Sequence, residues 1–442
     1  MLSILFKRWQ RQFIVSMKAI LDCNNFYCAC ERLFLPQLAE KPVIVLSNND
    51  GCIVSRSDEA KLLGIPMAGP YFMAKPVIER NKVAVFSSNY HLYGDLSWRV
   101  METLRQMIGK ENVEVYSVDE AFLNLSLFTN HNLYTTGLQL KDEVELWTGI
   151  KVSVGIAPTK VLCKVANHIA KKNKIASNCV VVLNDAAEIK KALQQTPVNE
   201  IWGIGAQYAQ KLKENWGIYD AWQLQGMSEN FAAKELGGVV GKRLIRELRG
   251  ETAREMQDEL VVKKMIATTR MFGQPAKTLQ EIKEAVATYT SRAAEKLRRQ
   301  HSAAKNISVF VVAKSEKSNA GFRGEMYSLS ATLPMATCFT NELIKYAVAL
   351  AEKLYVKGRT YKKAGVMLSG LVPDTSIQAN LFCHATKNNE RKLMEMIDNI
   401  NFSQGNDILK FATSGTRRNW KMRQELRSPR YTTRWNELFT LT

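Results

Sequence analysis

Two adjacent carboxylates, Asp119 and Glu120, constrain the fold of this chain more than any other feature of its sequence. Val113 and Val115 precede them and the apolar residues of 121–125 follow, so the pattern predicts two short strands joined by a turn. Adjacent acids repel each other, and a divalent cation with oxygen ligands would relieve that repulsion. A solvated acidic turn is the alternative interpretation.

A third acid, Asp22, ends an apolar strand expected at 18–21, and a helix is expected next at 26–33. A carboxylate at the end of a central strand is well placed to meet an acidic turn on a neighbouring strand. Three acids around one point would supply the protein ligands of two Mg²⁺ ions, with phosphate oxygens and water completing the coordination.

The chain also carries a large excess of positive charge, because 61 Lys and Arg stand against 42 Asp and Glu and give a net charge of +19. A polyanionic partner would explain this excess, and nucleic acid is the first candidate. An anionic membrane surface is the second, although no apolar run approaches the roughly 20 residues of a membrane span. The length of 442 residues allows about two to four domains with proper cores.

Eight cysteines raise the question of disulfides or a zinc site. None of them forms a Cys-x-x-Cys pair, and several lie in apolar surroundings, where a thiol packs as a small hydrophobe. We therefore expect reduced thiols and a cytoplasmic protein. Residues 1–16 lack the order of a signal peptide, and we interpret them as an added or misassigned start before Met17. A short amphipathic surface helix is the alternative for them.

Residues 21–31 (Leu-Asp-Cys-Asn-Asn-Phe-Tyr-Cys-Ala-Cys-Glu) resemble the opening motif of Y-family translesion DNA polymerases, and residues 117–122 match that family's second acidic motif. Within the family, residues 47–57 and 428–434 resemble the UmuC-like group, the catalytic subunits of bacterial DNA polymerase V. The resemblance extends from Met17 to the end of the chain. It implies an α+β, right-hand polymerase with a ferredoxin-like palm.

The same resemblance implies how the chain is divided into domains. We expect an N-terminal extension at 1–16, a palm at 17–187 with small fingers inserted at about 37–84, a helix-hairpin-helix thumb at 188–255, an α+β little finger at 256–370 and a basic, partner-binding C-terminal region at 371–442.

By this resemblance Asp22, Asp119 and Glu120 are the catalytic metal-binding carboxylates, and the backbone carbonyl of Cys23 adds a ligand. One Mg²⁺ ion would lower the pKa of the primer 3′-hydroxyl, and the other would neutralise the leaving pyrophosphate.

The resemblance also implies residues that contact the nucleotide. Tyr27 matches the steric gate, a ring that would clash with a 2′-hydroxyl, although the sequence does not separate its role from that of Phe26. Ser55 and Lys61 fall where the triphosphate ligands of the fingers fall. Lys160 begins a helix after a strand and matches a residue that contacts the β- and γ-phosphates, at a helix end that suits phosphate. We expect Lys164, one turn later, at the surface or the rim of the core.

Two glycine-rich stretches, 201–205 and 237–243, have the form of phosphate-binding hairpins between helices. Glycines let backbone N–H groups approach a phosphate without interference from a Cβ. The residues expected to contact DNA are Gly203, Gly205, Gly238, Gly241 and Lys242. Residues 256–370 hold 13 Lys and 6 Arg against 9 acids, a net charge of +10 that exceeds an ordinary solvated basic face. We expect DNA binding to weaken steeply with salt.

Two further segments suggest protein partners. The peptide Gln378-Ala-Asn-Leu381-Phe382 resembles the motif that docks on the sliding clamp, with Leu381 and Phe382 as apolar anchors. Residues 409–434 hold eight Lys or Arg and one acid among aromatic residues, a composition that suits single-stranded DNA or a protein partner. By resemblance we favour a UmuD′-like dimer and a RecA filament as the partners.

These patterns predict a DNA-directed DNA polymerase that performs error-prone, template-directed translesion synthesis in the SOS response to DNA damage, at the nucleoid. Two alternatives remain open. A nucleotide cyclase shares the palm and its paired acids but does not need two phosphate-binding hairpins. A non-catalytic DNA-binding scaffold would keep the fold without using the carboxylates.

Overall fold

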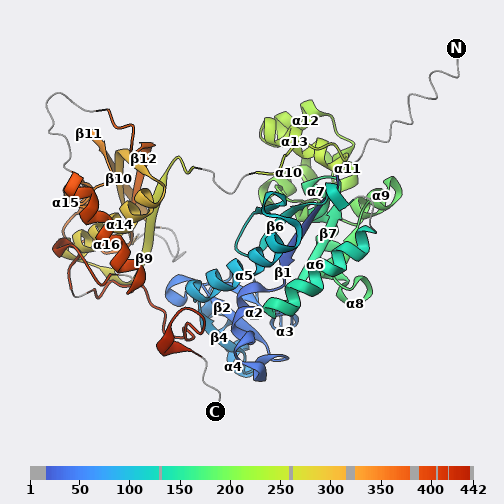
Figure 1. Ribbon diagram of the computed structural model, residues 1–442, viewed down its shortest axis with the longest axis horizontal. Coiled ribbons are helices and arrows are strands. Elements are labelled where there is room, and N and C mark those ends of the chain that lie inside the picture. Colours follow the sequence, from blue (N-terminus) through green and yellow to red (C-terminus); the bar gives the residue numbers. More distant parts are fainter. Residues whose placement is uncertain are drawn as a thin grey trace. The chain divides into compact units, whose positions relative to one another are not determined.

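The structure is a computed structural model that describes residues 16–128, 132–257, 262–314, 324–378, 388–404, 407–416 and 418–438. The chain divides into two compact units (Figure 1). Unit 1 comprises Met1–Leu46, Cys52–Val261 and Leu426–Thr442, and unit 2 comprises Ser47–Gly51 and Val262–Glu425. The last segment of the chain therefore belongs to unit 1, although it follows unit 2 in sequence.

A five-stranded sheet forms the centre of unit 1, and all neighbouring strands are antiparallel except the last two. Its strand order is β5 (Val113–Val115), β6 (Glu120–Asn124), β1 (Lys18–Cys23), β7 (Val152–Ala157) and β8 (Val180–Val182). The first four strands alternate with helices in the chain order β-α-β-β-α-β, and β1 lies between β6 and β7. This is the predicted ferredoxin-like arrangement of the palm.

Helices cover both faces of this sheet, because its strands carry apolar side chains on both sides. One face packs against α2 (Phe26–Leu33), α5 (Tyr90–Ile108) and α6 (Leu133–Thr148). On the other face, α7 (Lys160–Lys172) packs over Ile20 and Phe122. Gly155 of β7 permits a close approach of α7, since a Cβ there would lie 2.3 Å from the backbone nitrogen of Asn167.

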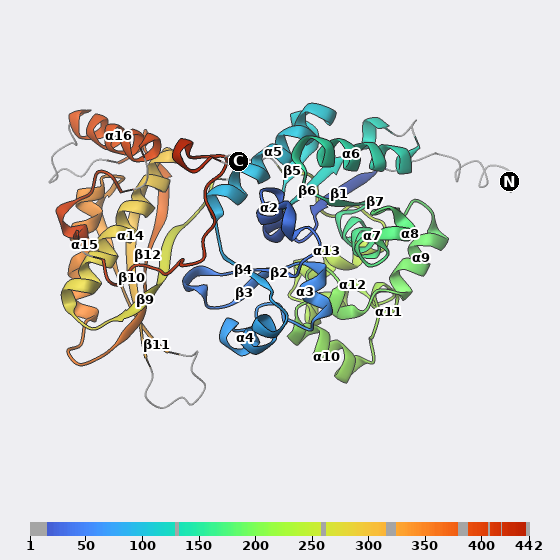
Figure 2. The same ribbon diagram turned by 90° about the horizontal axis from the view of Figure 1, so that it is seen from below.

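A second, three-stranded sheet lies in the region predicted to be the fingers (Figure 2). It consists of β3 (Ile53–Arg56), β2 (Val43–Leu46) and β4 (Ala84–Ser87), with α3 (Asp58–Leu62) and α4 (Tyr71–Arg80). The region predicted to be the thumb is helical. Its helices are α9 (Ala186–Gln194), α10 (Ala206–Trp216), α11 (Ala221–Gln225), α12 (Glu229–Glu235) and α13 (Val239–Leu248).

Unit 2 is built on an antiparallel four-stranded sheet with helices α14 (Leu279–Arg299) and α15 (Thr340–Leu354) on one face. Its strand order is β11 (Glu325–Thr337), β10 (Ser302–Ala313), β12 (Tyr361–Pro373) and β9 (Ile266–Ala276). Along β10, Ile307 and Val309 point into the core while Ser308 points away, the alternation expected of a half-buried strand. A further helix, α16 (Asn388–Ser403), follows the sheet.

The described cysteines are all free thiols. Cys383 and the N-terminal residues 1–15 lie outside the described part of the chain. Among the described helices, none combines the length and the apolar character that a bilayer crossing requires.

Candidate functional site

The backbone brings the three residues predicted to bind metal, Asp22, Asp119 and Glu120, to one end of two paired strands. The antiparallel register of β1 and β6 sets Asp22 opposite Glu120, and the N–H of Cys23 donates to the carbonyl of Asp119 at 2.8 Å. Asp22 is buried, while Asp119 and Glu120 are half-buried. The convergence follows from the register, because residues paired across two strands lie about 5 Å apart.

Hydrogen bonds close the turn that presents the two adjacent acids. The backbone N–H groups of Tyr116 and Ser117 both donate to the carbonyl of Glu120, at 3.0 and 3.1 Å. The hydroxyl of Ser117 donates to the Asp119 carboxylate at 2.5 Å. The acids therefore occupy a defined turn at the start of β6, as the sequence predicted.

Two lysines of α7 reach these carboxylates, and neither of them was predicted from the sequence to lie at the site. The Nζ of Lys171 lies 2.5 Å from Asp22 Oδ1, and the Nζ of Lys164 lies 2.6 Å from Glu120 Oε1. The two lysines are seven residues apart, a spacing that places both on one face of a helix. This spacing, in a helix that packs across β1, is the sequence signal from which the two lysines could have been predicted at the site.

The carboxylates are close enough to perturb each other's pKa. Burial raises the pKa of Asp22 to about 7 although the charge of Lys171 opposes the shift, and a hydrogen bond with Glu120 raises it further. Burial also favours the neutral form of Glu120, but hydrogen bonds from Asp22 and Lys164 outweigh it and hold the pKa of Glu120 below its usual value. The two pKa values are therefore driven apart: Asp22 is the carboxylate that favours its neutral form, and Glu120 is the one that favours its charged form.

The chemistry of this site fits a divalent cation. Carboxylate oxygens are the ligands that Mg²⁺ prefers, and two ammonium groups already pair with these acids. In the described residues no three Asp, Glu, His or Cys side chains are arranged as a ready metal site. A bound cation would replace the lysines as the partner of the acids. The thiol of Cys23 is not a suitable ligand, since burial raises its pKa well above the usual value.

The structure separates the two aromatic rings that the sequence could not. Phe26 is buried in the core beneath the sheet, whereas Tyr27 is half-buried and its ring stacks on Tyr93 with centroids 4.6 Å apart. Burial, with contributions from Tyr90 and the charge of Asp119, raises the pKa of Tyr27 to about 12. Tyr27 is thus the accessible ring near the carboxylates, and its role as a steric gate stays a prediction.

The two predicted fingers ligands lie beside Asn25, the residue that precedes the helix carrying Tyr27. The hydroxyl of Ser55 donates to the carbonyl of Asn25 at 3.5 Å, and the Nζ of Lys61 lies 2.6 Å from its side-chain oxygen. Lys61 also contacts Asp58, which pairs with Lys174 as well. Burial favours the neutral form of Asp58, but these hydrogen bonds outweigh it and hold the pKa of Asp58 below its usual value.

Lys160 begins α7 as predicted, but its ammonium group is already paired. Its Nζ lies 2.5 Å from the Glu114 carboxylate and 2.8 Å from the carbonyl of Glu255, and the side chain is buried. A phosphate could reach Lys160 only if this ion pair opened. The geometry therefore favours Lys164 and Lys171 over Lys160 as cations near the carboxylates.

The glycines of the predicted hairpins fall into two kinds. Gly203 and Gly238 have positive φ angles of 97° and 68°, and at these positions and Gly205 no described atom lies within 4 Å of an added Cβ. The N–H of Gly238 donates to the carbonyl of Ala233 at 2.8 Å, so Gly203 and Gly205 of the first hairpin present the more open backbone. Gly241 is different, because an added Cβ would lie 2.2 Å from the carbonyl oxygen of Ala232. Close packing of α12 on α13 explains the glycine at 241, and its contact with DNA stays a prediction.

Only one of the three named residues of the predicted clamp motif is described. Gln378 is exposed, and Leu381 and Phe382 lie outside the described residues, so the clamp motif stays a prediction.

Much of the basic tail packs on the protein itself. Trp420 is buried in the core of unit 2, with its ring 5.8 Å from that of Tyr289. From Leu426 onward the tail packs on unit 1, where the N–H of Ser87 donates to the carbonyl of Leu426 at 2.9 Å. The tail, which was predicted as a surface for partners, thus contributes to both units.

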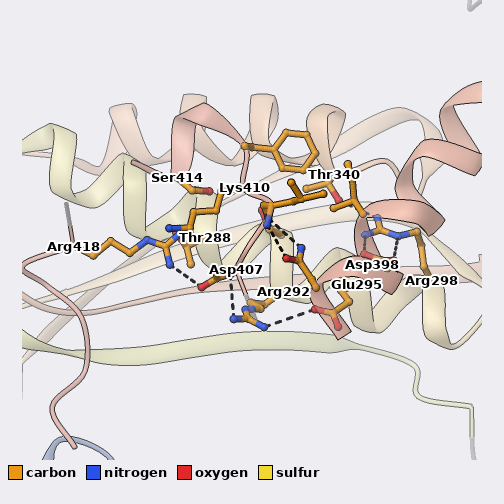
Figure 3. Close-up of a pocket in the computed structure, with 15 residues that line it drawn as sticks. Thr288, Arg292, Glu295, Arg298, Thr340, Asp398, Asp407, Lys410, Ser414 and Arg418 are labelled. Atoms are coloured by element: carbon orange, nitrogen blue, oxygen red, sulfur yellow. Dashed lines mark hydrogen bonds and ion pairs between the residues drawn. The ribbon is translucent and has the colours of Figure 1, made fainter. Parts of the chain in front are cut away.

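A charged pocket in unit 2 lies between α14, α16 and the residues after α16 (Figure 3). Arg298 forms a two-pronged pair with Asp398 at 2.6 and 2.7 Å. Asp407 accepts from Arg418 at 2.7 Å and pairs with Arg292 at 3.1 Å. These pairs hold α16 and the segment after it against α14, so we interpret the pocket as structural.

Comparison with known proteins gives matches along almost the whole chain. Residues 21–168 match the model of the impB/mucB/samB family, residues 263–381 match the C-terminal domain of that family, and residues 391–441 match a domain of unknown function. The chain is 40% identical over 424 residues to Protein UmuC of Salmonella typhimurium, covering 96% of this chain and 99% of that relative. It is 38% identical over 426 residues to Protein MucB of Escherichia coli, with the same coverage.

Solved structures resemble the fold. The Y-family DNA polymerase chimera Dbh-Dpo4(243-245)-Dbh matches with a TM-score of 0.67 and 21% identity, covering 80% of this chain and 99% of the chimera. An insertion ternary complex of Dbh DNA polymerase matches with a TM-score of 0.54 and 21% identity, covering 80% and 98%. At this identity the match supports the fold.

Proposed function

We propose a mechanism for this chain from the premise that it belongs to the impB/mucB/samB family and is a Y-family, DNA-directed DNA polymerase. Its activity is error-prone, template-directed translesion synthesis in the SOS response, and its fold implies a requirement for a divalent cation. One observation carries the proposed site: the register of β1 and β6 that sets Asp22 opposite Glu120, with Asp119 beside them.

We assign two Mg²⁺ ions to these three carboxylates and the backbone carbonyl of Cys23. When bound, the ions would lower the pKa of the primer 3′-hydroxyl and offset the charge of the leaving pyrophosphate. Before that, Lys164 and Lys171 hold the carboxylates in place through the ion pairs described above. Once released, their ammonium groups are close enough to the site to contact the triphosphate.

The nucleotide would lie between the carboxylates and the fingers. Tyr27 would exclude a 2′-hydroxyl by its ring, which Tyr93 supports from behind. Ser55 and Lys61 would meet the triphosphate from the side of Asn25. Lys160 would join them only after its pair with Glu114 opens, so we rank it below the other residues.

DNA would be held by backbone and by charge. Gly203 and Gly205 would offer open backbone to phosphates, and Gly238 would do so only if its N–H left the carbonyl of Ala233. Lys242 in α13 would add a cation near the second hairpin. The net charge of +10 over 256–370 would add a second, sequence-independent grip.

Protein partners would bring this polymerase to damaged DNA at the nucleoid in the cytoplasm. We propose that Gln378, Leu381 and Phe382 bind the sliding clamp. A UmuD′-like dimer and a RecA filament would bind basic and aromatic residues of the tail that packing leaves exposed, among them Trp435.

Primer extension across an abasic site tests this function, with Mg²⁺, deoxynucleotides, a UmuD′-like partner and activated RecA present. Asp119→Ala should abolish extension and retain binding to primed DNA. A non-catalytic scaffold predicts that Asp119→Ala leaves function intact, and a nucleotide cyclase predicts a cyclic product without a primer. Inactivity of the unmodified chain with all partners present would contradict the proposal.

A further inference from the structure

The C-terminal segment reaches the aromatic rings behind Tyr27. Residues 428–434, a motif singled out by the sequence, pack on unit 1 next to α2 and α5. The hydroxyl of Ser428 donates to Oε1 of Glu31 at 3.0 Å, and the hydroxyl of Tyr93 donates to the same oxygen at 2.6 Å. Tyr93 in turn stacks on Tyr27 with an interplanar angle of 18°.

This chain of contacts is buried. Glu31 is 0% exposed, Tyr93 is 1% exposed and Ser428 is 6% exposed. A buried carboxylate needs its hydrogen-bond donors, and the two hydroxyls are the donors recorded for Glu31 among the described residues. The position of Glu31, and through it that of the Tyr93 hydroxyl, therefore depends on Ser428.

The segment is itself fixed at this point. The side-chain amide of Asn89 donates to the carbonyl and the hydroxyl of Ser428, both at 3.0 Å, and to the carbonyl of Pro429 at 3.1 Å. Asn89 immediately precedes α5, the helix that supplies both Tyr90 and Tyr93 to the surroundings of Tyr27.

We propose that Ser428, acting through Glu31 and Tyr93, is a positioning residue that holds the ring of Tyr27 and thereby sets discrimination between deoxyribose and ribose. The proposal rests on the proposed function of Tyr27 as the steric gate. Its physical basis is that a stacked ring follows its neighbour: a shift of Tyr93 moves the surface against which a 2′-hydroxyl would clash. The C-terminal segment is then a part of the nucleotide site as well as a support for the fold.

The test measures kcat/KM for a deoxynucleotide and for the matching ribonucleotide in the full-length chain with its partners. Ser428→Ala should raise relative ribonucleotide use roughly threefold to tenfold, the range that loss of one neutral hydrogen bond produces. Tyr93→Phe, which removes the other donor to Glu31, should shift the ratio in the same direction.

A matched control distinguishes positioning of the Tyr27 ring from a general contribution of the C-terminal segment to stability. Phe34→Leu weakens the stack between Phe34 and Tyr431, whose ring centroids are 4.5 Å apart, and leaves the contacts of Glu31 in place. It should lower stability and leave the sugar ratio unchanged. Equal ratios in Ser428→Ala, Tyr93→Phe and the unmodified chain would overturn the proposal, as would a shift caused by Phe34→Leu alone.

Tyr27→Ala distinguishes failure of this inference from failure of the gate. If Tyr27→Ala leaves ribonucleotide use low, the proposed gate itself is wrong. If it raises ribonucleotide use while the Ser428 and Tyr93 variants do not, only the positioning role fails. With the gate removed, adding Ser428→Ala should cause no further change, because the two act on one ring.

Discussion

Carboxylates removed from solvent, Asp22 fully and Asp407 in part, are neutralised differently in the two units. In unit 2, burial favours the neutral form of Asp407, but Arg292 and Arg418 outweigh it and hold the pKa of Asp407 below its usual value. In unit 1, Asp22 pairs with one ammonium group, that of Lys171, and burial raises its pKa to about 7. Asp407 is therefore compensated by its neighbours, while Asp22 is not.

Asp22 is more deeply buried than Asp407 and has one cation beside it where Asp407 has two, and the kind of cation differs as well. Arginine offers a planar fork that fixes a carboxylate with two bonds, as Arg298 does for Asp398. Lysine is a compact charge without this fixed fork, and Lys171 contacts one oxygen of the Asp22 carboxylate. The arginine pairs of unit 2 are suited to hold structure, and the lysine pairs of unit 1 are suited to give way to another cation.

The largest expected effect is on primer extension, which should depend on the carboxylate of Asp22 and not on that of Asp407. Asp22→Asn keeps the shape of the side chain but removes a metal-binding charge, so extension should fall roughly 10³-fold. Binding to primed DNA should remain, because the proposed grips lie in the hairpins and the basic module. Single-turnover extension and a DNA-binding assay on the same preparation measure both quantities.

Asp407→Asn is the matched control in unit 2. It should destabilise that unit, since it leaves Arg292 and Arg418 without their common partner. Extension per folded molecule should stay within about twofold of the unmodified chain. An equal loss of extension in both variants would show that the comparison does not separate function from structure.

The next expected effect is a loss of stability when the cation of a pair is removed, and it is measured as a change in the free energy of unfolding. Arg298→Met breaks a pair whose arginine side chain is 9% exposed, and it should lower stability by about 3 kcal/mol. Lys171→Met removes a single contact from a lysine that is 35% exposed, so its effect should be below about 1 kcal/mol. Denaturant titrations followed by probes in each unit give the values. Equal losses would mean that the lysine pairs are structural too.

The sequence was sufficient to predict what depends on local pattern. The acidic turn, the strand ending at Asp22 and the helix beginning at Lys160 were each expected from residues that are neighbours in the chain. The strand order of the palm followed from the resemblance. These features depend on periodicity and motif, so each can be recognised within a single segment of the sequence.

What the sequence missed depends on packing between distant segments. Lys171 reaches Asp22 only because α7 lies close over the sheet at Gly155, and Glu114 captures Lys160 across the same face. The contact between Ser428 and Glu31 joins residues almost the whole length of the chain apart. No local pattern encodes such partners, and composition suggested only that the tail was basic.

Glu31 provides the third and smallest test, because it is a buried carboxylate with hydroxyl donors in place of a cation. Burial raises its pKa from 4.5 to about 7, although hydrogen bonds from Tyr93 and Ser428 oppose the shift. The folded state thus keeps a proton that the unfolded chain loses between these two values, and stability should fall as the pH rises through this window.

Glu31→Gln removes the titration and retains an acceptor for both hydroxyls. From pH 5 to pH 8 the variant should gain on the order of 2 kcal/mol relative to the unmodified chain. If the difference in the free energy of unfolding between the variant and the unmodified chain stayed constant over this pH range, Glu31 would already be ionised at pH 5. The kind of hydrogen-bond partner would then not explain how the carboxylates of this protein differ.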